Sequence, residues 1–152
     1  MHDLEIKKYW NSFKNSYPEY VSYDQPVSFY FCDNKKDADE CADLVVNRVK
    51  RATSPSVWSI KKNKEKFPEI GDIAIVTDWE GFPKAIIRTI KVDIVKFKDI
   101  SPEYAFLEGE GDKSLAYWRN VHLEYYSNEM SAFGELPDDN MDIICEQFER
   151  IW

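Results

Sequence analysis

The chain is 152 residues long, 43% hydrophobic and 15% aromatic, and it carries a net charge of −8. This length suits one domain with a core of its own, and this aromatic content excludes a disordered chain. The acidic balance argues against a protein that coats nucleic acid non-specifically, because phosphate binding requires positive potential.

Two helices are expected before residue 50. The first covers about residues 3–17, where apolar side chains recur at helical spacing until Pro18 (Ile6, Tyr9, Trp10, Phe13 and Tyr17). The second covers about residues 37–49, without a clear capping box, and its apolar residues share one face (Ala38, Cys41, Ala42, Val45 and Val49). Each helix therefore has one face to bury.

Strands are expected to follow. Residues 73–77 indicate a strand that leads through a turn at residues 78–83 into a long return strand, about residues 84–97. Along the return strand, Ile86, Ile90 and Ile94 fall on one face, and the alternation slips near Ile94 and Val95. A β-bulge at that slip would bend the strand into a barrel.

A third helix is expected over about residues 114–133, with a stripe of large side chains (Leu115, Trp118, His122, Tyr125, Tyr126 and Phe133). Residues 141–151 indicate a closing strand. Helices on both flanks of a strand-rich centre favour one α+β domain over residues 1–152, and not an alternating βαβ sheet.

No feature of the sequence indicates a membrane or secreted protein. No apolar run approaches the roughly 20 residues that cross a bilayer, and the N-terminus lacks the pattern of a signal peptide. Cys32, Cys41 and Cys145 are odd in number and far apart, which fits neither a zinc spacing nor a disulfide framework. We therefore expect a cytoplasmic protein, with no metal and no cofactor.

Positive charge is concentrated in one window. Residues 47–66 carry a net charge of +6, and the other 132 residues carry −14. A small basic island on an acidic body suits a confined anionic ligand better than a long duplex, so duplex DNA is not an expected partner. The lysine run at residues 61–66 is either a solvated linker or a segment that steers an anionic ligand.

Several motifs, in order, resemble those of the ASCH domain family. Residues 48–53 (Arg-Val-Lys-Arg-Ala-Thr) resemble its Gly-x-Lys-x-x-Thr motif, residues 70–72 its Gly-Asp turn, and residues 108–122 its longest signature. Asp33-Asn34 and Cys145-Glu146 also fit, so the resemblance covers about residues 10–152. One departure is Arg48 in place of the leading glycine; Asn47, which tolerates a left-handed backbone, is expected to shift the helix cap by one residue.

The resemblance implies a PUA-like β-barrel with flanking helices that binds RNA or a modified nucleoside in a pocket at the barrel rim. Some relatives hydrolyse the acetamide of N4-acetylcytidine, and one branch is associated with ribonuclease activity. If the roles in these relatives are assigned to the matching residues of this chain, Lys50, Thr53 and Glu110 would be catalytic. Thr53 would attack the amide carbonyl, Lys50 would take and return the proton, and Glu110 would position the water or leaving group.

The catalytic interpretation sets two conditions. Lys50 and Thr53 converge only if the chain turns between a helix end and a strand start. Glu110 must lie near the substrate, because a carboxylate paired tightly with Lys50 would keep the lysine charged and oppose its role as a base. The competing interpretations are a solvated basic turn and a solvated acidic loop that caps the third helix. Glu108 is the second candidate carboxylate.

Substrate-binding candidates surround this trio. Trp58 or Trp118 would stack on a base, Arg51 or Arg119 would hold a phosphate, and His122 would reach the pocket, although each also has an ordinary core or surface role. The alternative functions are a non-catalytic RNA-binding module and a metal-assisted ribonuclease in which Glu108, Glu110 and Asp112 hold a divalent ion. The sequence leaves the substrate and the oligomeric state open.

Overall fold

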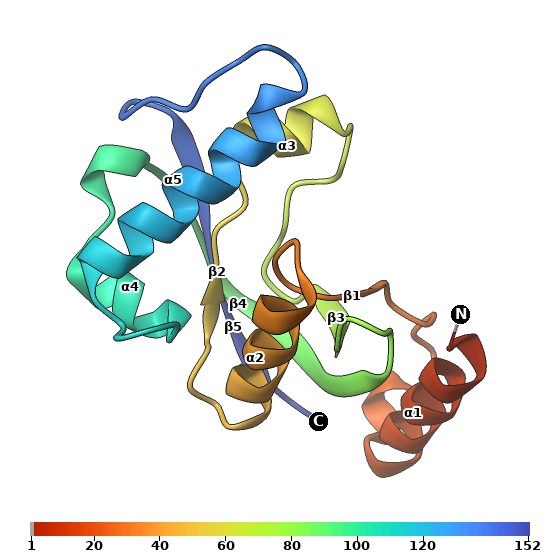
Figure 1. Ribbon diagram of the computed structural model, residues 1–152. Coiled ribbons are helices and arrows are strands. Elements are labelled where there is room, and N and C mark those ends of the chain that lie inside the picture. Colours follow the sequence, from red (N-terminus) through yellow and green to blue (C-terminus); the bar gives the residue numbers. More distant parts are fainter. Residues whose placement is uncertain (1) are drawn as a thin grey trace.

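The computed structural model describes residues 2–152 of the chain (Figure 1). No helix in this part of the chain is long and apolar enough to cross a membrane. The elements follow in the order α1 (Asp3–Ser16), η1 (Pro18–Tyr20), β1 (Ser28–Phe29), α2 (Lys35–Val46), β2 (Ala52–Thr53), α3 (Val57–Lys62), β3 (Ile73–Thr77), β4 (Pro83–Lys96), η2 (Phe97–Asp99), α4 (Pro102–Glu108), α5 (Leu115–Ser131) and β5 (Asp142–Arg150).

The strands form one mixed five-stranded sheet in the order β1-β3-β4-β5-β2. Its centre is β4, which pairs antiparallel with β3 through its first half and with β5 through its second half. β1 joins β3 in parallel at one edge, and β2 joins β5 antiparallel at the other. The α+β class is confirmed. Within residues 2–152, β1 and β2 are the two edge strands of the sheet. The closed barrel that we expected is therefore not shown.

The helices cover the sheet in separate places (Figure 1). α1 packs Ile6, Trp10 and Phe13 with Ile75 and Ile86, and α2 buries one face with residues of β3, β4 and β5 (Val76, Ala85, Ile87 and Phe148). α4 and α5 share a third cluster with β5. Burial of each large apolar side chain contributes about 1.5–3 kcal/mol, so the three clusters fix where the helices end and where their loops begin.

The expected bulge in the long strand lies elsewhere. The register shifts between Thr89 and Lys91, not near Ile94 and Val95. An extra residue reverses the face of every later side chain, so the face assigned to Ile90 and Ile94 by unbroken alternation was wrong. Ile90 is 46% exposed and Ile94 56% exposed, whereas Thr89 is buried.

The start of α2 also differs from the prediction. Asn34 caps the helix: its Oδ1 accepts from the Asp37 backbone N–H at 2.9 Å, and its Nδ2 donates to the Asp37 carboxylate at 2.9 Å. This reciprocal pair starts the helix at Lys35, two residues earlier than expected. The short helices α3 and α4 were not predicted.

Candidate functional site

The turn that ends α2 directs Lys50 into the interior. After Val46 the backbone N–H groups of Val49 and Lys50 both donate to the Leu44 carbonyl oxygen, at 2.9 and 3.1 Å. The left-handed residue of this turn is Arg48, with φ +61°, whereas Asn47 has φ −84°. The expected shift of the cap to Asn47 is therefore wrong, and Arg48 keeps the position of the family glycine. Its guanidinium donates to the Arg150 carbonyl oxygen at 3.0 Å, which offsets part of the backbone strain.

A second turn brings the acidic loop to the same place. α4 ends at Glu108, and Gly109 continues with φ +72°. A Cβ at Gly109 would lie 2.5 Å from the Val49 carbonyl oxygen, so only glycine lets the two turns come this close. The Arg51 backbone N–H donates to the Leu107 carbonyl oxygen at 2.7 Å. The two turns therefore fix Glu108 and Glu110 beside Lys50.

Lys50 is the buried cation of the site. Its side chain is 2% exposed, and its ammonium donates to Glu108 at 2.9 Å, to Glu110 at 2.8 Å and to the Ala52 carbonyl oxygen at 2.9 Å. Burial alone would lower the pKa of Lys50, but the charges of Glu108 and Glu110 outweigh burial and raise it well above its usual range. The ammonium thus stays protonated with all three protons donated. Such close pairing opposes the role of base that was predicted for Lys50.

Glu108 is the buried carboxylate at the centre of the network. Its Oε1 accepts from Lys50, and its Oε2 accepts from Ser54 Oγ at 2.5 Å and Trp118 Nε1 at 2.5 Å and lies 3.0 Å from His122 Nε2. Burial acts to raise the pKa of Glu108, but the charges of Lys50 and His122 prevail and lower it well below its usual range. Glu108 is therefore an ionised anchor of the site.

His122 and Trp118 complete that anchor. The His122 ring stacks on the Trp118 ring with centroids 4.0 Å apart, and its Nδ1 lies 2.8 Å from the Trp118 carbonyl oxygen. Burial alone would lower the pKa of His122, but the adjacent Glu108 raises it. Trp118 is 3% exposed and donates its only N–H to Glu108, so it does not offer a free face to a base as we expected. His122 reaches the cavity wall.

The three predicted catalytic residues line one cavity of about 580 Å³. Thr53, the last residue of β2, lines the cavity, and its carbonyl oxygen accepts from the Tyr104 hydroxyl at 2.7 Å. No side-chain hydrogen bond from another residue of the described chain engages the Thr53 hydroxyl, so this group is available to a ligand. The remaining walls are largely aromatic and aliphatic (Val27, Phe29, Tyr30, Phe31, Ile60, Val121 and Tyr125).

The charged groups of the cavity are mostly acidic. Its lining includes five carboxylates (Glu65, Glu108, Glu110, Glu129 and Glu146) and two ammonium groups (Lys50 and Lys66). An acidic wall repels phosphate, which contradicts the expectation that the basic window serves a confined anionic ligand. Lys62 of that window is held by Glu135 at 3.3 Å, and Lys66 lies 3.9 Å from both Glu69 and Asp72.

Four of the proposed ligand-binding residues lie outside this cavity: Trp118, described above, and Arg51, Trp58 and Arg119. Arg51 lines a separate hollow of about 190 Å³. Trp58 donates to Glu135 at 3.1 Å and packs edge-on against Phe133. The Arg119 guanidinium donates to the Lys98 carbonyl oxygen at 3.2 Å. These contacts give the Trp58 and Arg119 side chains structural partners in place of a nucleotide.

The acid triplet proposed for a ribonuclease does not converge. Glu108 is buried in its own network, and Asp112 is exposed and accepts from the Ser114 backbone N–H at 2.9 Å. Within residues 2–152, the one group of potential metal ligands combines Glu110 with Cys32 and Cys41. The divalent-ion site expected from the three acids is therefore wrong.

Sequence reasoning missed Ser54, Tyr104 and the cysteine pair. Ser101-Pro102 is a helix-start signal that could have found α4 and with it Tyr104, because Ser101 caps the helix and Pro102 opens it. No local signal marks Ser54 as a partner of Glu108, 54 residues away. Cys32 and Cys41 are nine residues apart, yet their Sγ atoms lie 3.6 Å from each other.

Comparisons with known proteins show the family and the fold. The sequence model of the ASCH domain matches residues 27–152. The crystal structure of an ASCH domain from Lactobacillus crispatus JV V101 is 30% identical, with a TM-score of 0.89 over 96% of this chain and 93% of that chain. Protein EF3133 from Enterococcus faecalis V583, of the family model DUF984, is 27% identical, with a TM-score of 0.89 over 99% of this chain and 90% of that chain.

A more distant structure shares the fold alone. The hypothetical protein PH0355 is 18% identical, with a TM-score of 0.52 over 74% of this chain and 93% of that chain. Among curated proteins, none matches the sequence significantly.

Proposed function

The chain belongs to the ASCH domain family, and on that premise we propose that it binds a modified pyrimidine nucleoside, free or at the end of an RNA strand, and hydrolyses an acyl amide on its base. N4-acetylcytidine is the representative substrate. The PUA-like character of the family supports a ligand derived from RNA.

One observation carries the proposal: a buried ammonium, two carboxylates and Thr53 line a single cavity. Its volume of about 580 Å³ is within the range of small-molecule sites. The apolar walls suit the flat face of a base. A solvated basic turn, the competing interpretation of residues 48–53, does not bury a lysine to 2% exposure.

The roles differ from those that the family resemblance alone suggests. Glu110 is the proposed base, because its carboxylate is 16% exposed on the cavity side and only its Oε2 is held by Lys50. It takes the proton of Thr53 as the hydroxyl attacks the amide carbonyl carbon, and it returns that proton to the departing base nitrogen. Water then hydrolyses the acyl ester, which releases the carboxylic acid and restores Thr53. Lys50 positions Glu110 and balances its charge.

The test is the release of acetate from N4-acetylcytidine, followed by chromatography of the nucleoside. We expect Glu110→Gln and Thr53→Val to reduce kcat/KM at least about 100-fold, since a positioned base contributes 10²–10⁴-fold. Asp112→Asn is the matched control: it removes an exposed carboxylate of the same loop, which lies outside the cavity, and it keeps full activity. Full activity in folded Glu110→Gln would refute the assigned roles. A wild-type protein that binds the nucleoside without cleaving it would support the non-catalytic module instead.

A further inference from the structure

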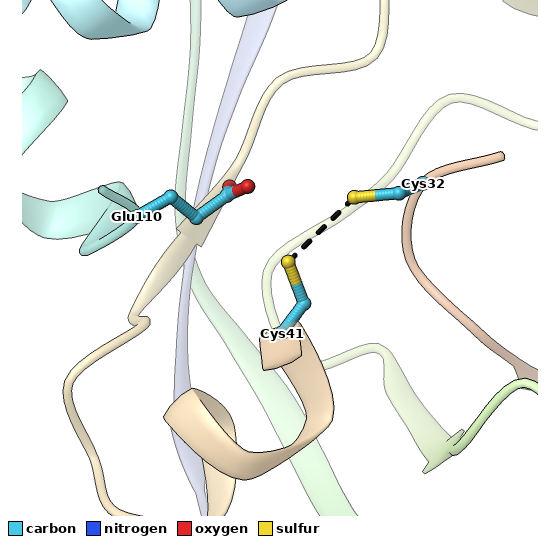
Figure 2. Close-up of side chains that lie close together, drawn as sticks. All are labelled: Cys32, Cys41 and Glu110. Carbon is cyan, nitrogen blue, oxygen red and sulfur yellow. Dashed lines mark hydrogen bonds between the residues drawn. The ribbon is translucent and has the colours of Figure 1, made fainter. Parts of the chain in front are cut away.

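The thiols of Cys32 and Cys41 lie beside the cavity and take no part in the proposed hydrolysis. Cys32 follows β1, Cys41 lies on the buried face of α2, and Glu110 follows α4. Figure 2 shows that the three side chains point toward one another from these separate segments. The Sγ atoms are 3.6 Å apart, and one ligand atom of each residue lies within 4.8 Å of the other two.

From this convergence we propose that Cys32, Cys41 and Glu110 bind a thiophilic divalent cation, with Zn²⁺ the best fit. The proposal does not depend on amide hydrolysis, but it shares Glu110 with it, and a bound cation would occupy the carboxylate that the hydrolysis uses as its base. Two thiolates and a carboxylate are ligands that zinc takes in proteins, whereas magnesium and calcium select oxygen ligands alone.

The spacing of the sulfurs favours a bridging cation. With Zn–S bonds of about 2.3 Å and a tetrahedral angle, two thiolate sulfurs lie about 3.8 Å apart, close to the 3.6 Å observed. A disulfide requires about 2.05 Å, so the sulfurs would have to approach each other much further to form one. A cation between them needs only a small adjustment of the sulfurs and a rotation of the Glu110 carboxylate.

The backbone of Cys32 supports a specific role for its thiol. Its φ is +69°, a left-handed conformation that is unfavourable for a residue with a Cβ. Such strain persists where the surroundings determine the conformation and is often found at ligand sites. Here the strained residue points its sulfur at Cys41 and lines the cavity.

The surroundings leave one coordination position open and balance the charge. Cys32 and Glu110 both line the cavity, so a fourth ligand, such as water, reaches the metal from that side. Glu110 can keep Oε2 on Lys50 while Oε1 binds the metal, which makes Lys50 a partner that orients a metal ligand. Binding releases two thiol protons as the dication enters, so the net charge of this buried region stays the same.

Cobalt(II) titration of the reduced, metal-free protein tests the proposal. We expect one Co²⁺ per chain, a thiolate-to-cobalt charge-transfer band, the visible bands of tetrahedral cobalt, and their loss when one equivalent of Zn²⁺ is added. Cys32→Ser and Cys41→Ser should each lose the charge-transfer intensity of one thiolate and weaken affinity at least about 100-fold, in line with the large free energies of thiolate zinc binding. Glu110→Gln should weaken affinity and retain the charge-transfer band.

Cys145→Ser is the matched control, because Cys145 is a buried thiol on β5 and belongs to a different core cluster. This variant should bind Co²⁺ like the wild type. Equal binding by the wild type and folded Cys41→Ser, or the absence of a sulfur band, would overturn the proposal. The proposal would also be overturned if Cys32 and Cys41 formed a disulfide and bound no metal. Hydrolysis is assayed separately with a chelator present, so failure of one proposal leaves the other testable.

Discussion

Lys50 is stable in the interior only while its carboxylate partners remain ionised. Removal of one partner of a buried ion pair costs about 3–5 kcal/mol, because the other charge is left uncompensated. We expect Glu108→Gln to lower the free energy of unfolding by about this amount in urea denaturation, and Glu110→Gln, which is partly exposed, by about half as much. Lys35→Ala, at an exposed pair with Asp39, should leave the free energy of unfolding almost unchanged. Equal losses for Glu108→Gln and Lys35→Ala would contradict this account of the site.

Glu129 should make stability depend on pH in the opposite direction from an ordinary paired acid. Burial, with the nearby charges of Glu65 and Asp33, raises the pKa of Glu129 from 4.5 to about 7. The folded protein then binds this proton more tightly than the unfolded chain does. The stability associated with Glu129 is therefore complete below about pH 4.5 and is lost as the pH rises toward 7.

The variant Glu129→Gln isolates this effect. It should match the wild type at pH 4 and be more stable by about 1 kcal/mol at pH 8, after discounting for solvent screening of a half-buried group. Urea denaturation at the two pH values measures the difference. Glu124→Gln, an exposed acid on the same helix, should show no such gap. If the two variants behave alike, Glu129 is not protonated in the folded protein at neutral pH.

At the scale of elements, the turn after α2 depends on a left-handed residue that the family supplies as glycine. Arg48 adopts φ +61° there, at a backbone cost that glycine does not have. Arg48→Gly and Arg48→Ala both remove the hydrogen bond to the Arg150 carbonyl oxygen. We expect the glycine variant to be the more stable of the two by about 1 kcal/mol in thermal or urea unfolding. A more stable alanine variant would show that this turn changes conformation.

The contact between the two turns can be tested at Gly109. Gly109→Ala adds a Cβ that meets the Val49 carbonyl oxygen at 2.5 Å, whereas Gly71→Ala, also at a positive φ, meets nothing within 4 Å. Both variants carry the left-handed strain, so the difference between them reports the clash. We expect Gly109→Ala to be the less stable by about 2 kcal/mol, a typical cost of overpacking, and the shifted loop to lower activity on N4-acetylcytidine. Similar urea midpoints for both variants would mean that the turns separate without cost.

The elements also show how far the sequence could predict this structure. Helical periodicity and strand alternation are local, so α1, α2, α5 and the strands β3 to β5 could be predicted to within a few residues. β1 and β2 have two residues each and α3 has six, too short for any period. The motif resemblance indicated Lys50, Thr53 and Glu110, but not that Lys50 is paired with two acids about 60 residues away. Partners at that separation are set by packing of the whole chain, as is the convergence of Cys32 with Cys41.

At the scale of the whole molecule, the distribution of charge determines the class of ligand. The net charge is −8. Most of the positive charge of residues 47–66 lies outside the cavity, since only Lys50 and Lys66 of this segment line it. Lys50 is already balanced by Glu108 and Glu110. Any further anion in the cavity would therefore face Glu65, Glu129 and Glu146 with Lys66 as the main counter-charge.

Uncharged nucleosides should consequently bind better than their phosphates. We expect the 5′-monophosphate of N4-acetylcytidine to bind at least about tenfold more weakly than the nucleoside, because a like charge in a partly enclosed site costs over 1 kcal/mol. Calorimetric titration of Thr53→Val, which avoids turnover, measures both ligands. At pH 8, above the raised pKa of Glu129, Glu129→Gln in the same background removes one repelling carboxylate and should narrow the difference in affinity between the two ligands. Raising the salt concentration should also narrow it, whereas phosphate-driven RNA binding would weaken as salt rises. Tighter binding of the monophosphate, with strong salt dependence, would mean that the ligand contacts the basic surface outside the cavity and would favour a nucleoside within an RNA strand over a free nucleoside.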